Sequence, residues 1–206
     1  KRQMNVMSTT QIDSQTKRNR LILGLVTLFF WASEYCHVPF FTPYLNSLGL
    51  TATIIGFVVG SYGFTQMCIR IPLGIFADVK NTYRMIIIFG CFCSTLSALG
   101  LYLVKNIVLL FFFRILAGVA ASTWVAFTVM YSGYYAPEES SAAMSHINAY
   151  NNTGKFLAFV LGTITATMFS YRVPLLMSFA TGVIALVLFT PLRALTETLY
   201  SRLPHR

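Results

Sequence analysis

The sequence has few charged residues, and very few of those are acidic. Lysine, arginine, aspartate and glutamate make up 10% of its 206 residues, and only six residues are aspartate or glutamate. A soluble domain of this size needs more polar side chains than this to cover its surface. Because 56% of the residues are hydrophobic and the mean hydropathy is +0.66, an ordinary soluble domain is excluded.

Cysteine and histidine are scarce as well, which argues against a metal site and against an enzyme. The four cysteines lie inside hydrophobic runs, where cysteine usually acts as a small buried apolar residue. A membrane hydrolase or transferase needs a nucleophile–base set or a metal cluster. The three histidines lie at different depths, so we expect no cofactor, no metal and no enzymatic activity. These residues are Cys36, Cys68, Cys91 and Cys93, and His37, His146 and His205.

The hydrophobic residues come in runs of roughly 20, the length that a helix needs to cross about 30 Å of hydrocarbon. Backbone groups in lipid must bond within their own segment, and the alternation of a β-barrel is absent. The sequence therefore predicts an all-α membrane protein, a bundle of six transmembrane helices over residues 21–192. The expected spans are about 21–43, 52–76, 85–104, 107–131, 146–169 and 173–192.

The distribution of the basic residues predicts the orientation of these spans. The net charge is +9, and no nucleic-acid motif accompanies it. Ten lysines and arginines lie in a flexible polar lead (1–20), the 78–84 loop and the tail (193–206), against Lys105 and Arg172 on the other side. The positive-inside rule therefore places both termini in the cytoplasm of a multi-pass plasma-membrane protein, with 193–206 as a cytoplasmic tail or the start of a central loop.

A short motif lies between the second and third expected spans. The segment Gly74-Ile-Phe-Ala-Asp78, followed by Lys80 and Arg84, resembles the loop signature of the major facilitator superfamily. That signature is glycine, three residues, aspartate, a basic residue, any residue, glycine and two basic residues. The sequence departs from it at Val79, Asn81, Thr82 and Tyr83.

Two further segments support this resemblance, which extends over about residues 20–192. Arg114-Ile-Leu-Ala-Gly118 resembles the superfamily's Arg-x-x-x-Gly pattern in the fourth helix, and Pro137-Glu138-Glu139 resembles its Pro-Glu segment before the fifth. The resemblance implies the amino-terminal six-helix half of a transporter. The missing carboxy-terminal half, in the same chain or in a second copy, and a small-molecule substrate are then the expected partners. We prefer the interpretation that the chain is a fragment.

The resemblance also implies roles for the loop and the cavity. The loop signature (Gly74, Asp78, Lys80 and Arg84) would control the conformational change. Gly74 would let helices pack closely, and Asp78 would cap the next helix and pair with arginines. The central cavity would be lined from this half by the first, second, fourth and fifth spans.

Charged side chains inside the membrane are costly and so mark candidate functional residues. At 1.5 Å per residue, Glu34 and Arg114 fall at one depth, and we expect them to pair. Lys155 also lies near mid-membrane. Asn148 and Asn152 precede it at helical spacing, and this polar face should line the cavity. By the same spacing, His37 shares a face with Glu34, and Gln66 shares one with Tyr62 and Arg70.

Structural interpretations of these residues stay open. Arg70 lies near the cytoplasmic end of its span and would extend to the interface or pair with Asp78. His37 would be a hydrogen-bonded polar residue near the outer interface, and Arg114 would have a structural role.

If Glu34 pairs with Arg114, Lys155 leaves the cavity with net positive charge. The sequence then predicts transport of an anionic or zwitterionic small molecule, coupled to protons through Glu34. The main alternative is a drug/proton antiporter in which Glu34 attracts lipophilic cations, although the fifth span lacks the Gly-Pro and Gly-Gly pairs of antiporters. A non-transporting fragment or scaffold is a further alternative.

Overall fold

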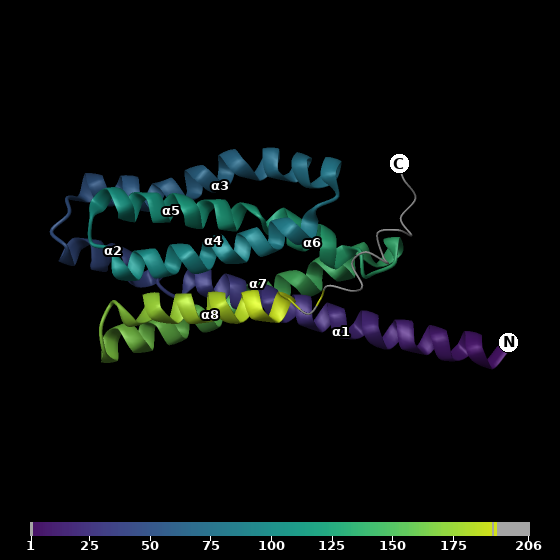
Figure 1. Ribbon diagram of the computed structural model, residues 1–206. Helices are drawn as coiled ribbons and strands as arrows, with labels where there is room; N and C mark the ends of the chain where they lie inside the picture. Colours follow the sequence, from purple (N-terminus) through teal and green to yellow (C-terminus); the bar gives the residue numbers. More distant parts are fainter. Residues whose placement is uncertain (1, 191, 193–206) are drawn as a thin grey trace.

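The computed structural model describes residues 2–190 and 192, with side chains from Ser14 onward. The predicted tail 193–206 lies outside the described residues. The described chain is helical throughout apart from short connections (Figure 1). The elements are α1 (Arg2–Tyr35), α2 (Val38–Ser47), α3 (Ala52–Lys80), α4 (Tyr83–Leu103), α5 (Ile107–Ser122), α6 (Trp124–Ser132), the 3₁₀ turn η1 (Pro137–Glu139), α7 (Ser140–Met168) and α8 (Val173–Phe189).

These elements form the predicted bundle of six helices, because α1 with α2, and α5 with α6, each make one interrupted span. Within the described part of the chain, four segments are long and apolar enough to cross a membrane by length and composition alone: Ser14–Ser47, Ala52–Lys80, Tyr83–Leu103 and Ile107–Ser132. Of the other two, α8 is apolar but has only 17 residues, and α7 has 29 residues but carries three asparagines and a lysine between residues 148 and 155.

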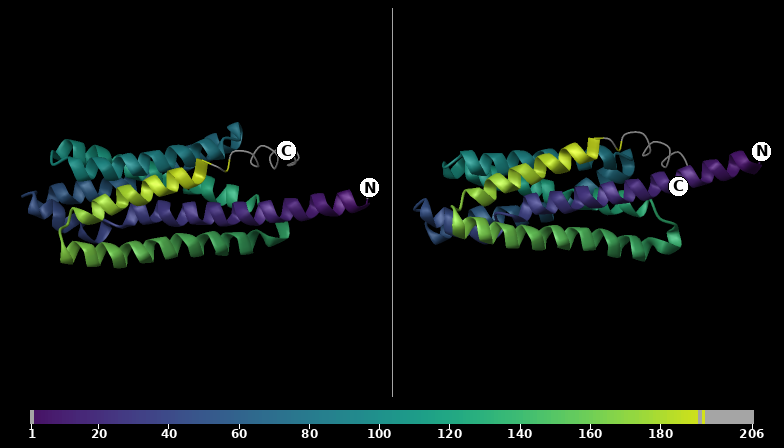
Figure 2. Two further views of the ribbon diagram at one scale, coloured as in Figure 1. Left: turned by 60° about the horizontal axis from the view of Figure 1, so that its bottom comes forward. Right: turned by 90° about the horizontal axis from the view of Figure 1, so that it is seen from below.

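The first span differs most from its predicted bounds of 21–43. The predicted flexible lead is helical from Arg2, and Figure 2 shows α1 extending beyond the bundle at its N-terminal end. No glycine or proline interrupts residues 2–23, so nothing ends the helix there. The helix stops instead at Tyr35. Pro39 would clash with the carbonyl four residues earlier, and the chain restarts as α2.

The fourth span is interrupted at Thr123, between α5 and α6. The hydroxyl groups of Ser122 and Thr123 donate hydrogen bonds to the carbonyls of Val119 and Ala120, both at 2.6 Å. Such bonds from a side chain to the preceding turn compete with the helical ladder. The connection between the predicted fourth and fifth spans, residues 132–145, is also shorter than expected, because α7 already begins at Ser140.

Neighbouring helices follow the order α3, α5, α4, α8, α1, α7 across the bundle (Figures 1 and 2). Glycines mark the closest approaches. A Cβ atom at Gly118 of α5 would lie 2.5 Å from the Tyr62 carbonyl oxygen of α3, and Cβ atoms at Gly154 and Gly162 of α7 would collide with the backbone of the first span. Small residues at such crossings are typical of helix packing in membranes.

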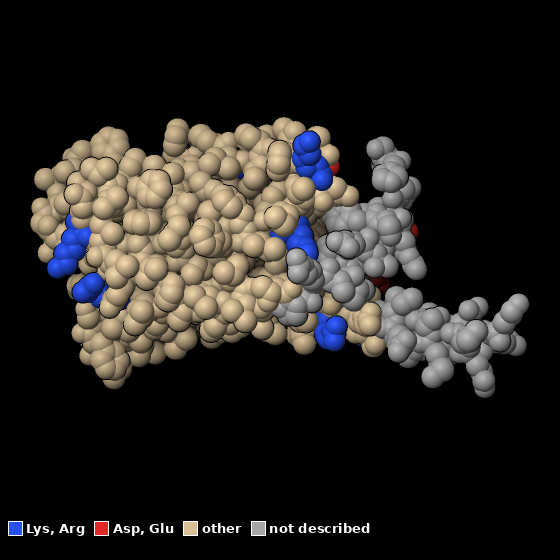
Figure 3. Space-filling view, viewed as in Figure 1, with Lys and Arg blue, Asp and Glu red and all other residues tan. Residues whose placement is uncertain are grey.

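The surface agrees with a membrane environment. On the face drawn in Figure 3, lysine and arginine lie toward the two ends of the bundle, with a wide uncharged band between them. Large apolar side chains are exposed on the helices of the bundle, among them Phe57, Phe64, Ile71, Phe156 and Val187.

Candidate functional site

Three of the predicted intramembrane residues come together at the break in the first span. Glu34, His37 and Arg114 are 3%, 4% and 4% exposed. Arg114 Nη1 donates a hydrogen bond to His37 Nε2 at 3.2 Å. The expected direct pair with Glu34 is not formed: among the described residues, no ion pair within 4.0 Å joins Arg114 to Glu34, although the two charges interact electrostatically.

Aromatic rings hold the Arg114 guanidinium in place. Its central carbon lies 4.8 Å from the ring centre of Phe41 on α2 and 4.7 Å from that of Tyr62 on α3. A guanidinium group over aromatic faces is stabilised electrostatically. Gly118 lies one turn after Arg114 and seats α5 against the backbone at Tyr62. The Arg-x-x-x-Gly spacing thus places the charge and the close contact on one face of α5.

The hydrogen bonds assign the tautomer of His37. Arginine can only donate, so His37 Nε2 must accept and the proton must sit on Nδ1. His37 Nδ1 lies 3.0 Å from Ser178 Oγ on α8, which therefore accepts this proton. His37 is neutral in this arrangement and links α5 to α8 through the bundle. The structure thus gives His37 the hydrogen-bonded role that one interpretation predicted, but in the core and in contact with Arg114.

A chain of serines extends the polar network next to Glu34. Ser94 Oγ of α4 donates to Ser33 Oγ of α1 at 3.0 Å, and Ser33 Oγ donates to the Ser178 carbonyl at 2.7 Å. The Oε2 atom of Glu34 is buried and has no hydrogen-bond partner among the described residues.

Lys155 lies apart from this network, on a half-buried patch of aromatic side chains. Its Nζ atom is 4.2 Å from the ring centre of Trp31 and 4.8 Å from that of Tyr35. Both rings project from one face of α1, four residues apart. Lys155 can reach them because Gly154, next to it, brings α7 onto the backbone of α1 at Leu28.

The asparagines of α7 divide between two faces. Asn148 and Asn152, which the spacing grouped with Lys155, are exposed in this half. Asn151 is 5% exposed and faces α1, and its side-chain oxygen has no partner among the described residues. Asn151 follows Ile147 by four residues, and Gly154 and Ala158 continue along the same face of the helix. This spacing could have indicated that Asn151 is buried.

The polar residues of α3 are separated along the helix. Gln66 Nε2 donates to the Ala121 carbonyl of α5 at 3.5 Å, so this side chain bridges two helices. Arg70 is half-buried, and no ion pair to Asp78 is formed within the described chain. The two residues are two turns, about 12 Å, apart on the same helix, which is too far for the predicted pair.

The loop signature has a different geometry from the one expected. Asp78 accepts a hydrogen bond from the Tyr83 hydroxyl. The N-cap residue of α4 is Thr82, and it makes no side-chain cap. A Cβ atom at Gly74 would meet Val125 at an ordinary 3.6 Å, so this glycine does not serve a close approach inside this half. Lys80 is exposed and Arg84 half-buried at the two ends of the turn.

Asn81 explains how the loop keeps its shape without the glycine of the signature. It ends α3 with φ = 54°, the left-handed conformation, and its backbone N–H bonds to the Ala77 carbonyl. Glycine is the usual residue there, and asparagine is the side chain that tolerates this conformation best.

Sequence reasoning did not include the side chains that position the charged groups. These are the serines Ser33, Ser94 and Ser178, and the aromatic residues Trp31, Tyr35 and Phe41. Serines spread over three apolar helices are a weak signal on their own, since small hydroxyl side chains are common in membrane helices.

Comparison with known proteins agrees with this fold. The sequence profile of the Major Facilitator Superfamily matches residues 23–204. The chain belongs to the Major Facilitator Superfamily. It is therefore a multi-pass membrane protein of a transporter family. An uncharacterized MFS-type transporter from Methanocaldococcus jannaschii is 23% identical over 173 residues, which are 84% of this chain and 45% of the relative.

Two further known proteins resemble this chain, one in sequence and one in fold. The quinolone resistance protein NorA of Staphylococcus aureus is 26% identical over 152 residues, 73% of this chain and 39% of NorA. A crystal structure of a bacterial homologue of the human lysosomal transporter Spinster, inward-facing and unoccupied, superposes with a TM-score of 0.67 at 14% identity. That match covers 90% of this chain and 42% of the other. The chain thus spans less than half the length of these relatives.

Proposed function

We propose that this chain forms one half of a secondary transporter, which carries an anionic or zwitterionic small molecule by alternating access. The substrate would bind between this half and a second six-helix half, in the same polypeptide or in a second copy. Family membership favours transport over the enzyme and scaffold alternatives. The excess of basic residues in the lead, the 78–84 loop and the tail supports cytoplasmic termini.

The position of the charges supports the sign of the substrate. Lys155 is half-buried on its aromatic patch, and Arg70 is near enough to interact with it electrostatically. Glu34, the only acidic side chain among the four intramembrane candidates, is 3% exposed and lies behind other side chains. A solute that approaches the Lys155 face therefore meets positive charge first, which attracts a carboxylate or phosphate and repels a cation.

The surroundings of Glu34 support it as the proton-exchanging group. Its side chain is 3% exposed, and its Oε2 atom has no hydrogen-bond partner among the described residues. An unpaired carboxylate is costly to bury, whereas a protonated carboxyl group is much less so. Release of the proton would place a negative charge near Arg114.

Transport by the full-length protein in proteoliposomes tests the proposal. We expect uptake of an anionic or zwitterionic member of a panel of carboxylates, amino acids, phosphate esters and lipophilic cations. Lys155→Met should raise KM at least about tenfold and Lys155→Arg should restore it, since losing one partner of a desolvated charge pair is costly. Glu34→Gln should flatten the pH dependence of uptake. Unchanged KM in Lys155→Met would rule out Lys155 as the counter-charge.

Proton-coupled drug export is the second candidate, and the likeness to NorA favours it. In that case a lipophilic cation would be the transported member of the panel. Lys155→Met should then lower its KM by removing repulsion, and Glu34→Gln should abolish its transport. The two candidates therefore predict opposite effects of the same Lys155 substitution.

A further inference from the structure

Lys155 differs from the other positively charged side chains that stack on aromatic rings. In the described part of the chain, three guanidinium groups lie over rings, and each also donates a hydrogen bond to an acceptor: those of Arg20, Arg114 and Arg172. The Nζ atom of Lys155 has no hydrogen-bond acceptor among the described residues and makes no ion pair within 4.0 Å. An ammonium group has three N–H donors, so all three are available to an anion.

The two rings under Lys155 are held in place by other aromatic residues. Trp31 meets Trp124 of α6 edge to face, with ring centres 5.5 Å apart and planes at 76°. Tyr35 meets Phe159 of α7 in the same way, at 5.6 Å and 76°. Such contacts orient a ring, so both ring faces stay in position when the ammonium group moves away. The bundle thus has a preformed cation site on α1, which its own lysine fills.

Arg70 of α3 is a second positive charge near this site. It is half-buried and interacts electrostatically with Lys155. Within the described chain its guanidinium group makes no hydrogen bond, and its Nε atom is buried without a partner. Two like charges repel each other, and a buried donor without an acceptor is costly. A carboxylate bound to both side chains would remove both of these costs.

We propose that the substrate is a zwitterion of the amino-acid type. Its carboxylate would bind Lys155 and Arg70, and its ammonium group would replace that of Lys155 on the faces of Trp31 and Tyr35. The four-carbon stem of lysine is flexible, so Lys155 can leave the rings to meet the carboxylate. This inference rests on the proposed function and decides between the anionic and the zwitterionic substrate.

The aromatic rings favour the zwitterion over ligands with a single charge. An anion would draw Lys155 away and leave the ring faces empty. A cation would have to displace Lys155 and would be repelled by Arg70. A zwitterion restores the contact between a positive charge and the rings. One such contact at a partly buried site is worth about fivefold in affinity, so two rings favour the zwitterion over a matched anion by at least about tenfold.

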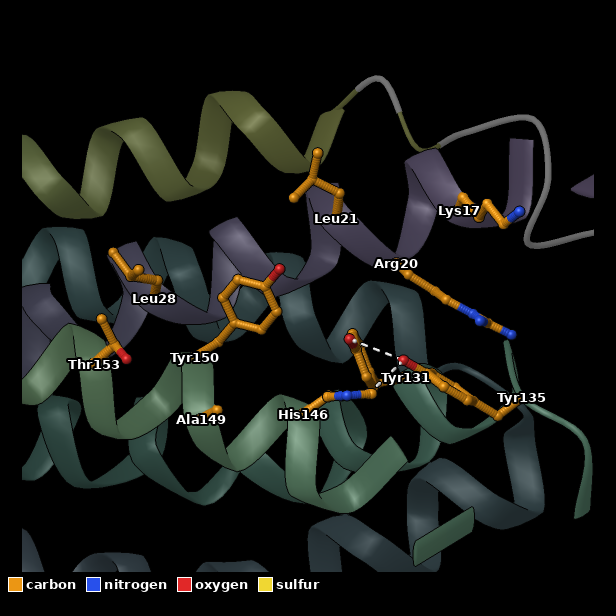
Figure 4. A pocket seen from close by; sticks show the side chains of 10 residues that line it. All are labelled: Lys17, Arg20, Leu21, Leu28, Tyr131, Tyr135, His146, Ala149, Tyr150 and Thr153. Atoms are coloured by element: carbon orange, nitrogen blue, oxygen red, sulfur yellow. Dashed lines mark hydrogen bonds between the residues drawn. The ribbon is translucent and has the colours of Figure 1, made fainter. Parts of the chain in front are cut away.

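The groove between α1 and α7 in Figure 4 is a competing position for an anion. It has a volume of about 520 Å³, and its lining includes Arg20 and no acidic side chain. His146 in its wall and Lys155 are nine residues apart on α7, which at about 100° per residue places them on opposite sides of the helix. Arg20 lies 3.7 Å from the ring centre of Tyr135 and donates to the Tyr134 carbonyl at 3.0 Å. A ligand in the groove would therefore depend on Arg20 and not on Lys155.

Ligand binding to the purified full-length protein, measured by isothermal titration calorimetry, tests the proposal. The probes are alanine, leucine and phenylalanine, each with two analogues. One analogue lacks the amino group (propanoate, 4-methylpentanoate and 3-phenylpropanoate), and the other lacks the carboxyl group (ethylamine, 3-methylbutylamine and 2-phenylethylamine). We expect at least one amino acid to bind at least about tenfold more tightly than its matched anion, with the matched amine the weakest of the three.

Two substitutions separate the ring contacts from the carboxylate contacts. Tyr35→Leu removes one ring and should weaken the amino acid about fivefold while the matched anion changes by less than about twofold, whereas Tyr35→Phe should leave both affinities unchanged. Arg70→Gln should weaken the amino acid and the anion equally, by about tenfold, because both carry the carboxylate.

Tyr102→Leu and Arg20→Gln are matched controls. Tyr102 also carries a cation, Arg172 at 4.6 Å from its ring centre, but at the end of α4. Arg20 is the stacked cation of the groove. Each substitution should change the affinity for the amino acid by less than about twofold, because neither side chain touches the proposed site.

Several results would overturn the proposal, and they differ in what they leave standing. Equal affinity for the amino acid and its anion, with both weakened by Lys155→Met, would refute the zwitterion and leave transport of an anion intact. Tightest binding of an amine would refute both. No binding of any amino acid, or equal losses of amino acid and anion in Tyr35→Leu, would exclude the ring site. A loss in Arg20→Gln as large as that in Arg70→Gln would place the ligand in the groove.

Discussion

The contact between Gly118 and the backbone of α3 makes the most specific prediction about stability. In Gly118→Ala, the added methyl group would lie 2.5 Å from the Tyr62 carbonyl oxygen, 2.8 Å from Thr65 Cβ and 3.3 Å from the Gln66 nitrogen. An ordinary C···O contact is roughly 3.3 Å, so the two helices must separate by about 0.8 Å at this crossing. Two of the three atoms belong to the backbone, which cannot rotate away.

The magnitude follows from two opposing effects. Overpacking of this kind costs typically 1–3 kcal/mol, whereas replacing glycine by alanine inside a helix contributes up to about 1 kcal/mol of stability. We therefore expect a net loss of about 1–2 kcal/mol. The Tyr62 ring should also move relative to Arg114, because Tyr62 provides both the crowded carbonyl and the stacked ring.

Thermal unfolding in detergent measures this effect, with Gly60→Ala as the control. Gly60 lies inside α3, where a Cβ atom would meet nothing within 4 Å among the described residues, so only the helix propensity changes. Gly118→Ala should lower the melting temperature and Gly60→Ala should hold or raise it. If both substitutions shift the melting temperature equally in the same direction, the close approach at Gly118 does not govern the packing of α5 on α3.

Two other predictions concern His37 and the loop before α4. His37→Leu removes the acceptor of Arg114 and the donor to Ser178, so it should lower the free energy of unfolding by about 2 kcal/mol or more. In His37→Gln the side-chain amide can both accept and donate, so the free energy of unfolding should fall by less. Equal losses in chemical denaturation would contradict the role of these bonds. Asn81→Val should destabilise by roughly 1–2 kcal/mol because a β-branched residue resists φ = 54°, whereas Asn81→Gly should be neutral or stabilising. Denaturation curves giving the reverse order would show that the left-handed turn is not the constraint.

Much of the fold could be predicted from the lengths of the hydrophobic runs. A run of roughly 20 apolar residues has few alternatives to a membrane helix, so the number of spans and their order are local properties. The ends of the helices were predicted less well. α1 ends at Tyr35 because of Pro39, and the fourth span is interrupted at Thr123 where hydroxyl groups bond to the preceding turn. The ends and interruptions of these helices depend on single side chains, and a hydropathy pattern, which averages over many residues, does not show them.

The depth of the candidate residues in the membrane could be predicted from the sequence, but the direction in which their side chains point could not. Counting 1.5 Å per residue placed Glu34 and Arg114 at one level, and both are buried near each other's charge. The count could not show that the chain breaks after Tyr35, which brings His37 onto Arg114. Likewise Lys155 was placed on a polar face with asparagines, but its contacts are the rings of Trp31 and Tyr35.

The sequence by itself determined that this protein lies in the membrane, that it consists of helical spans, and that it belongs with the superfamily whose motifs it carries. These properties follow from hydrophobicity and spacing, which are additive along the chain. Only the tertiary structure decided which groups meet. Arg114 bonds His37 and not Glu34 because helix rotation, the break near Pro39 and the close crossing at Gly118 together set the direction of each side chain. Those directions depend on packing between helices that are far apart in the sequence.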